Sequence, residues 1–231
     1  LEPCKCEELI AYETGVKASL FDNRLQANAA IYYYDYRDQQ LQGVLYTQTG
    51  RVGRMINVPK SHIQGAELEL RWQPLDNLTI TQAVGYKYGE YDEFFFVNAS
   101  ATEAAKDPVT GEYNTIIYSD RAGERLPFPR FDYKGSIAYE HQIGDWGVEA
   151  ETNYAYRSEK FSTSSNSVIG DYWLMNANLT FRPMNGSYAF GFFVNNLTNA
   201  YSEESRNRFI SASTGSPNAP RTWGARVSYR Y

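Results

Sequence analysis

Long apolar runs are missing from this sequence of 231 residues. The longest mostly apolar stretch, Ala27–Tyr34, has only the length of a strand and contains Asn28. A transmembrane helix needs roughly 18–20 consecutive apolar residues. The sequence therefore excludes a helical membrane protein, and its mean hydropathy of −0.55 agrees with that exclusion.

Cysteine and histidine are also scarce. The two cysteines form Cys4-Lys5-Cys6, and the two histidines, His62 and His141, lie far from them in the sequence. A disulfide across one residue is strained, and a metal site on the cysteines needs more ligands than the sequence supplies nearby. We interpret the cysteines as an incidental pair and expect no metal and no cofactor.

Basic charge and catalytic motifs are lacking as well. The formal net charge is −5 and the isoelectric point is about 5.2, whereas a nucleic-acid-binding protein shows a basic face. We find no Gly-x-Ser-x-Gly motif, no phosphate-binding loop and no zinc-ligand spacing. The sequence predicts neither a nucleic-acid partner nor an enzyme.

What the sequence does contain is aromatic side chains, at 16% of residues, and alternation with period 2. The alternating segments are about 10–15 residues long, which suits tilted membrane-spanning strands. We predict nine strands, at Ile10–Leu20, Arg24–Tyr36, His62–Gln73, Leu78–Tyr91, Phe131–Glu140, Trp146–Tyr156, Tyr172–Arg182, Tyr188–Asn196 and Thr222–Tyr231.

The connections between these segments alternate between short and long. Short turns are expected near 21–23, 74–77, 144–145 and 184–186, and long loops at about 37–61, 92–130, 158–171 and 199–221. Short turns at one end and long loops at the other are typical of outer-membrane β-barrels. A sandwich distributes its loop lengths more evenly, and a propeller repeats at a fixed period.

The two faces of each predicted strand differ in chemistry. One face carries charged residues and Asn, as at Glu67 and Glu69, which a barrel would turn toward its lumen. The other carries small aliphatic residues in mid-strand and Tyr or Trp near the strand ends, as in a lipid-facing band with aromatic girdles. The same alternation in a soluble sandwich would separate a core face from a water face. We interpret Glu67 and Glu69 as part of a solvated lumen wall, or as a wall that contacts a solute or a plug.

Several stretches resemble the TonB-dependent receptor family. Tyr12–Leu41 resembles its strand–turn–strand element, with an Asp-Asn-Arg turn and a Tyr-Asp-Tyr cluster. Ile56–Ile80 is similar to its Asn-x7-Gly-x-Glu-x-Glu strand. Phe192–Glu204 and Pro220–Tyr231 look like its last two strands, with Asn-Leu-Thr and Pro-Arg-x-aromatic-Gly elements.

The resemblance implies an all-β, antiparallel transmembrane barrel of about 22 strands, of which this chain would be the C-terminal nine or ten, without the plug domain. It also implies active import of a scarce bulky solute, with a ferric siderophore as the first candidate and cobalamin, haem or an oligosaccharide as others. The implied location is the bacterial outer membrane. The implied partners are its lipid and lipopolysaccharide, the plug and remaining strands, TonB through the absent N-terminal part, and the barrel-assembly machinery.

The last segment resembles a barrel-closing C-terminal signal. Trp223, Val227, Tyr229 and Tyr231 fall on one face, and the chain stops on an aromatic residue. An exposed edge strand of this kind is an aggregation hazard unless it is paired. We expect Tyr231 to be the true C-terminus and the missing material, including the partner of this strand, to precede Leu1. The absence of a signal peptide at Leu1 fits a fragment or a processed chain.

A ligand site is expected in the long loops. Arg51, Arg54, Arg121 and Arg125 are candidates for attracting an anionic ligand such as a ferric chelate. Phe95, in a run of three phenylalanines, is a candidate for capping it. The alternative to a ligand site is that the arginines pair with nearby carboxylates and that the phenylalanines pack against other loops.

Two other functions fit parts of the pattern. The first is a passive channel or structural barrel of about ten strands, with an extra strand within Gln40–Thr49. The second is a soluble secreted β-protein that binds carbohydrate through exposed Tyr and Trp.

Overall fold

The computed structural model describes residues 4–48, 50–162, 167–208 and 213–230. Most of these residues lie in strands, and one short helix, α1 (Ala99–Ala104), interrupts them. Within the described ranges no helix is both long enough and apolar enough to cross a membrane.

In the described part of the chain the largest sheet has nine strands, in the order β1-β2-β3-β4-β7-β8-β11-β12-β15. The strand pairs with a described register are antiparallel, and each predicted strand is confirmed. Their bounds are β1 (Glu8–Leu20), β2 (Leu25–Thr47), β3 (Gly50–Leu75), β4 (Leu78–Glu93), β7 (Phe131–Ile143), β8 (Trp146–Arg157), β11 (Tyr172–Pro183), β12 (Tyr188–Asn195) and β15 (Thr222–Tyr229).

Among the described residues, three two-stranded antiparallel sheets occupy connections between these strands. They are β5 (Phe95–Val97) with β6 (Tyr118–Asp120), β9 (Lys160–Ser162) with β10 (Ser167–Ile169), and β13 (Glu203–Arg208) with β14 (Ser213–Pro217). The expected long loops at 92–130, 158–171 and 199–221 therefore each contain regular structure.

The expectation of a loop over 37–61 is wrong. Strand β2 continues to Thr47 and β3 begins at Gly50, so the segment is mostly a long hairpin. Asp38 has a φ of 50° within β2, and a left-handed residue interrupts the alternation of side chains that reveals a strand. The extension is held by cross-strand contacts instead: Asn57 Nδ2 donates to the Asp38 carbonyl at 2.6 Å.

The chain divides into two compact units. The first, called here the hairpin unit, comprises Leu1–Glu13, Tyr32–Gln64 and Tyr88–Leu126. The second, called the sheet unit, comprises Thr14–Ile31, Gly65–Lys87 and Pro127–Tyr231.

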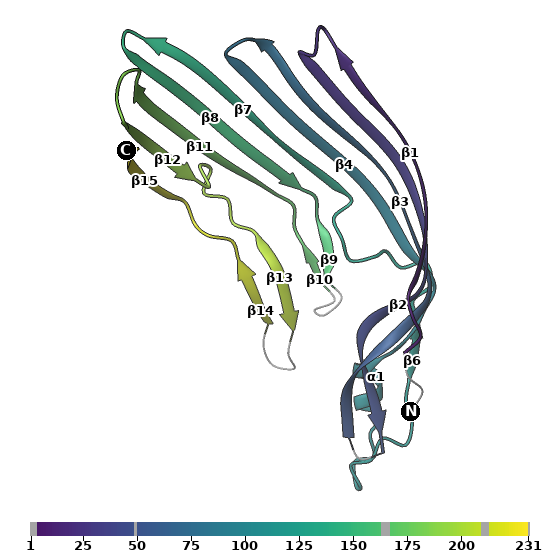
Figure 1. The fold of residues 1–231 in the computed structure, drawn as a ribbon. Coiled ribbons are helices and arrows are strands. Elements are labelled where there is room, and N and C mark those ends of the chain that lie inside the picture. Colours follow the sequence, from purple (N-terminus) through teal and green to yellow (C-terminus); the bar gives the residue numbers. More distant parts are fainter. Residues whose placement is uncertain (1–3, 49, 163–166, 209–212, 231) are drawn as a thin grey trace. The chain divides into compact units, whose positions relative to one another are not determined.

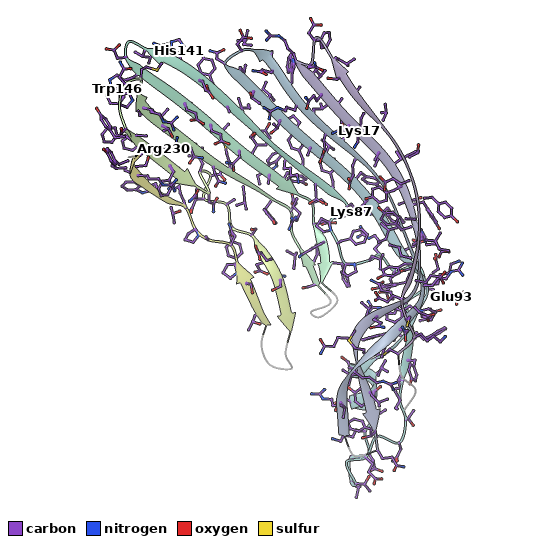
Figure 2. The ribbon with its side chains drawn as sticks, viewed as in Figure 1. Lys17, Lys87, Glu93, His141, Trp146 and Arg230 are labelled. Atoms are coloured by element: carbon purple, nitrogen blue, oxygen red, sulfur yellow. The ribbon has the colours of Figure 1, made fainter. Side chains whose placement is uncertain are left out.

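Tight turns gather at one end of the sheet unit, and the β9–β10 and β13–β14 hairpins lie at the opposite end (Figure 1). The β1–β2 turn places Phe21, Asp22 and Asn23 in the left-handed region, and Gly144 does the same in the β7–β8 turn with a φ of 58°. Trp146 lies beside the β7–β8 turn (Figure 2). The turns and an aromatic strand end thus lie together, as the sequence predicts.

The strand register gives the sheet unit two distinct faces. Across β7, β8 and β11, Tyr133 pairs with Tyr156, which pairs with Trp173. The residues that alternate with these aromatic residues along each strand point to the opposite, polar face, as Asn153 and its partner Asn176 do. The apolar face continues to β15, where Trp223, Val227 and Tyr229 are 80%, 70% and 68% exposed. Tyr231 lies outside the described residues.

Buried apolar side chains are concentrated in the hairpin unit. They include Tyr46, Val58, Tyr91, Phe94 and Tyr113. The sheet unit instead exposes large apolar side chains such as those at Trp72, Ile137 and Leu179. An apolar face of this extent on one side of a sheet marks an interaction with a membrane or a protein surface.

Candidate functional site

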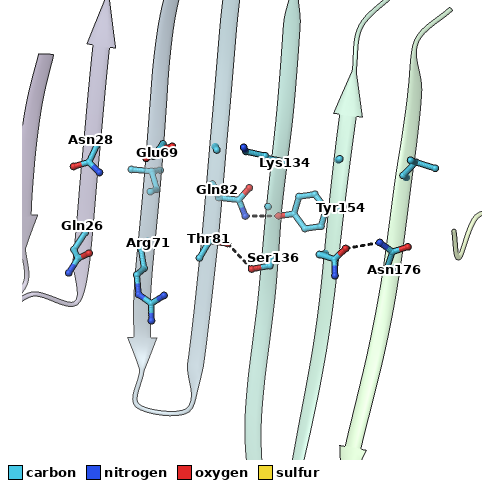
Figure 3. A pocket seen from close by; sticks show the side chains of 16 residues that line it. Gln26, Asn28, Glu69, Arg71, Thr81, Gln82, Lys134, Ser136, Tyr154 and Asn176 are labelled. Atoms are coloured by element: carbon cyan, nitrogen blue, oxygen red, sulfur yellow. Dashed lines mark hydrogen bonds between the residues drawn. The ribbon is translucent and has the colours of Figure 1, made fainter. Parts of the chain in front are cut away.

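The polar face of the sheet unit is hollowed. A pocket of about 590 Å³ is lined by residues of β2, β3, β4, β7, β8 and β11. Gln26 and Asn28 from β2, Glu69 and Arg71 from β3, and Lys134 from β7 contribute polar side chains to it (Figure 3). Their positions follow from period 2, because residues i and i+2 of a strand share a face.

Short hydrogen bonds between neighbouring strands fix the floor of this pocket. Thr81 Oγ1 and Ser136 Oγ are 2.6 Å apart, and Asn176 Nδ2 donates to Asn153 Oδ1 at 2.8 Å (Figure 3). These bonds satisfy side chains that would otherwise stay free to contact a ligand. The charged residues of the lining have both signs, so the pocket suits a polar solute or a polar protein surface more than a single kind of ion.

The polar face continues toward β15. A second hollow of about 320 Å³ is lined by Glu149 and Glu151 from β8, Asn178 and Arg182 from β11, and Arg226 from β15. Neither hollow brings together a nucleophile with a base. Their polar and charged side chains form a hydrated surface. The sequence predicted this polar wall from Glu69 but did not single out Lys134, Asn153 or Asn176. Polar residues repeat at every second position around these residues, and that spacing could have revealed them.

All five loop residues expected to bind ligand belong to the hairpin unit. Arg51 is exposed, and its guanidinium Nη1 lies 3.3 Å from Glu103 Oε1 of α1. The Tyr113 hydroxyl donates to the same carboxylate at 2.9 Å. Arg51 thus pairs with a nearby carboxylate, and Arg54 is half-buried on β3.

Arg121 is also engaged within the protein. Its guanidinium forms an ion pair with Glu124 and lies 5.9 Å from the centre of the Phe96 ring. Phe94 is buried and packs on Tyr91 with a ring separation of 4.8 Å. The phenylalanine run therefore packs at Phe94 and Phe96, and it holds an arginine in place.

Phe95 and Arg125 are more accessible than these neighbours. Phe95 is 67% exposed on β5, because alternation turns it away from Phe94 and Phe96. Arg125 is exposed and forms an isolated β-bridge with Glu90 of β4. Of the five expected residues, these two present the most available apolar and cationic groups.

Two loop carboxylates have lowered pKa values. Backbone N–H groups of Thr110 and Val109 donate to Asp107 and hold the pKa of its carboxyl below its ordinary value. Arg206, whose Nε lies 2.7 Å from Glu203 Oε2, together with the Tyr201 hydroxyl, lowers the pKa of Glu203. Both carboxylates are therefore occupied by contacts within the chain that favour the ionised form.

The cysteines are both free thiols. Cys4 Sγ donates to the Met55 carbonyl at 3.0 Å, and Cys6 is exposed.

An antiparallel sheet with a hollowed polar face, an exposed apolar face and tight turns at one end has the architecture of an outer-membrane β-barrel wall. The chain belongs to the TonB-dependent receptor family, since the family model described as "TonB dependent receptor-like, beta-barrel" matches residues 5–197. It is accordingly a section of a bacterial outer-membrane barrel, and the resemblance seen in the sequence is confirmed.

Solved structures of larger proteins share this fold. The chain matches the ferric yersiniabactin uptake receptor FyuA from Yersinia pestis with a TM-score of 0.72 and 18% identity, over 96% of this chain and 29% of that one. It matches the pyoverdine outer membrane receptor FpvA from Pseudomonas aeruginosa PAO1 with a TM-score of 0.68 and 14% identity, over 97% and 30%. For the copper transporter OprC the TM-score is 0.66 and the identity 17%, over 99% and 32%. The chain thus spans about 30% of the first of these proteins.

Proposed function

We propose that this chain forms part of the barrel wall of a receptor that imports a scarce, bulky solute across the outer membrane with energy delivered through TonB. The observation that carries the proposal is the family match over residues 5–197. The polar hollow supports it, because such a wall suits a plug domain or a hydrated solute. The soluble carbohydrate-binding alternative is excluded by the family assignment.

We propose a ferric siderophore as the solute. FyuA and FpvA are described as receptors for ferric yersiniabactin and pyoverdine, and OprC as a copper transporter. In this chain the exposed Arg125 and Phe95 offer the charge and the apolar surface that an anionic metal chelate with aromatic groups would use. The proposed partners are a plug domain, TonB, lipopolysaccharide and the barrel-assembly machinery.

An uptake assay tests the proposal. Cells that depend on this protein should accumulate ⁵⁵Fe from one class of ferric siderophore, and a protonophore or deletion of TonB should abolish the accumulation. Uptake that persists without TonB would favour the passive channel instead. Cobalamin, haem and oligosaccharides form the comparison panel.

Arg125→Ala is expected to weaken binding of the ferric chelate by about 10- to 100-fold, because a charge-assisted hydrogen bond contributes roughly 1.5–3 kcal/mol. The dissociation constant can be measured from quenching of tryptophan fluorescence. Arg24→Ala is the matched control, since Arg24 is also exposed but pairs with Asp76 beside a tight turn of the sheet unit. Equal dissociation constants for the two variants would remove Arg125 from the site.

A further inference from the structure

A histidine and two carboxylates converge in the hairpin unit. His62 lies on β3, and Glu90 and Asp92 lie on the neighbouring β4. One ligand atom from each residue lies within 4.8 Å of the others. Glu90 and Asp92 share a face of β4 because they are two residues apart, and His62 meets them from the next strand.

Contacts within the hairpin unit orient each of these side chains. His62 Nδ1 lies 2.8 Å from Asp92 Oδ1. The Tyr33 ring stacks on the imidazole with centres 5.8 Å apart and planes 17° apart. The Tyr88 hydroxyl donates to Glu90 Oε2 at 2.5 Å, which leaves Oε1 to face another partner. Metal-binding residues in proteins are typically oriented by supporting contacts of this kind.

The cluster is partly withdrawn from water. The His62 side chain is 16% exposed and that of Asp92 27%. Two carboxyl groups beside each other in such surroundings favour a bound cation, because partial burial strengthens the interaction of ionised groups with it. Neither the hydrogen bond from Tyr88 nor the stacked Tyr33 ring supplies a full positive charge, and Arg125, which lies across from Glu90 in an isolated β-bridge, is exposed to solvent.

We propose that His62, Glu90 and Asp92 form a binding site for a divalent first-row transition-metal ion, of which Zn²⁺ is the test case. One imidazole nitrogen and two carboxylate oxygens suit such an ion better than Ca²⁺ or Mg²⁺, which prefer oxygen ligands alone. Ligand atoms around zinc lie about 2.0–2.2 Å from it, so small side-chain rotations bring the three groups to bonding distance. A fourth position stays open to water. The site does not depend on which solute the receptor imports.

The ion would join β3 to β4 within the hairpin unit. Because binding of an ion to the folded state alone stabilises that state, zinc should raise the resistance of this unit to proteolysis. No motif in the sequence points to the site, since His62 is separated from Glu90 and Asp92 by the rest of β3, a turn and most of β4.

Zinc binding by the purified protein tests the proposal. The protein as it occurs in the outer membrane, carrying no histidine tag, is extracted in detergent, stripped with EDTA and titrated with ZnCl₂ by calorimetry. The expected result is one equivalent of zinc. His62→Gln and Asp92→Asn should each weaken binding by about 100-fold or more, because loss of a group that only supports a metal ligand already costs roughly 10–100-fold.

His141→Gln is the matched control. His141 is the other histidine of the chain, and it also stacks on a tyrosine, Tyr139, with ring centres 6.0 Å apart. This variant should bind zinc as the unaltered protein does. Cobalt(II) provides a second readout, because an ordered site of low coordination number gives intense visible absorption that His62→Gln should abolish.

Three outcomes would overturn the proposal: no uptake of zinc by the stripped protein, unchanged affinity in His62→Gln, or equal losses in His62→Gln and His141→Gln. Heat-modifiable migration in gels verifies that each variant is folded. If His62→Gln does not fold, Asp92→Asn and Glu90→Gln carry the test, and unchanged affinity in both overturns the proposal.

Discussion

Asn196→Ala is expected to lower the free energy of unfolding by about 3 kcal/mol, from the loss of a buried amide partner and from backbone strain together. Asn196 is buried. Its Oδ1 accepts from the Ala200 N–H at 2.8 Å, and its Nδ2 donates to the carbonyls of Ala200 and Ala219 at 2.9 and 3.1 Å. In Asn196→Ala the Ala200 N–H is left without this partner, which costs roughly 1–3 kcal/mol. The carbonyls of Ala200 and Ala219 keep hydrogen bonds from Asn218 Nδ2 at 3.1 and 3.3 Å.

Backbone conformation adds to this loss. Asn196 has a φ of 51°, and alanine in the left-handed region costs about 1 kcal/mol more than asparagine or glycine, which adopt it readily. Asn196→Gly therefore separates the two effects, because it removes the hydrogen bonds without the backbone strain. We expect Asn196→Gly to recover about 1 kcal/mol of the loss.

Denaturant unfolding of the protein in lipid vesicles, followed by tryptophan fluorescence, measures both variants. Asn195→Ala is the matched control, since the adjacent Asn195 is exposed and its Nδ2 makes one long contact of 3.4 Å to Thr222 Oγ1. Asn196 closes the base of the segment that carries the β13–β14 hairpin, so Asn196→Ala should also expose that hairpin to protease. A midpoint equal to that of Asn195→Ala would show that these hydrogen bonds do not hold the segment.

Gly135→Ala is expected to destabilise the sheet unit by about 1–3 kcal/mol, the usual range for overpacking. A Cβ atom at this position would lie 2.7 Å from the Thr81 carbonyl oxygen and 2.8 Å from the Tyr154 hydroxyl. The carbonyl belongs to the backbone of β4, which is paired with β7 from Leu78 to Tyr86 and cannot yield freely there.

The space above Gly135 also holds a polar cluster. Gln82 Nε2 donates to the Tyr154 hydroxyl at 2.5 Å, and the Tyr133 hydroxyl donates to Gln82 Oε1. Strand alternation places Gln82 with Val84 and Tyr86, on the apolar face. A side-chain amide there requires partners because lipid offers none, and a methyl group at residue 135 would separate Gln82 from them.

Gly85→Ala is the control for this replacement, since a Cβ atom at Gly85 of β4 meets nothing within 4 Å. Unfolding midpoints in denaturant distinguish the two variants. We expect Gly85→Ala to leave the midpoint unchanged or to raise it slightly, because alanine reduces the entropy of the unfolded chain. If both alanine variants unfold at one midpoint, the close approach above Gly135 carries no energetic cost.

The candidate site was only partly accessible to sequence reasoning. Charge and aromatic character singled out Arg51, Arg121 and Phe95, and the structure gathers these residues in one unit. It pairs the two arginines with Glu103 and Glu124. The sequence suggested that the arginines pair with carboxylates but could not name the partners, because the partner of a loop arginine depends on how the loop folds back.

The long hairpin shows a second limit. Backbone hydrogen bonds hold β2 and β3 together through residues 37–61, and these bonds do not depend on the side chains. The side chains there are largely polar and Asp38 is left-handed, so the sequence pattern predicts a loop. In the other strands the alternation of polar and apolar residues could be recognised in the sequence. Lipid on one face and water on the other require opposite chemistry at residues i and i+1.

The sequence by itself determined the antiparallel strands, their two faces and the family, since these follow from the order of residues along each strand. Only the tertiary structure decided which strands continue through a predicted loop, which loop arginines are paired, and that His62 meets Glu90 and Asp92. These depend on neighbours from other strands. The physical reason is that a strand fixes the direction of its side chains locally, whereas register and loop packing fix what those side chains touch.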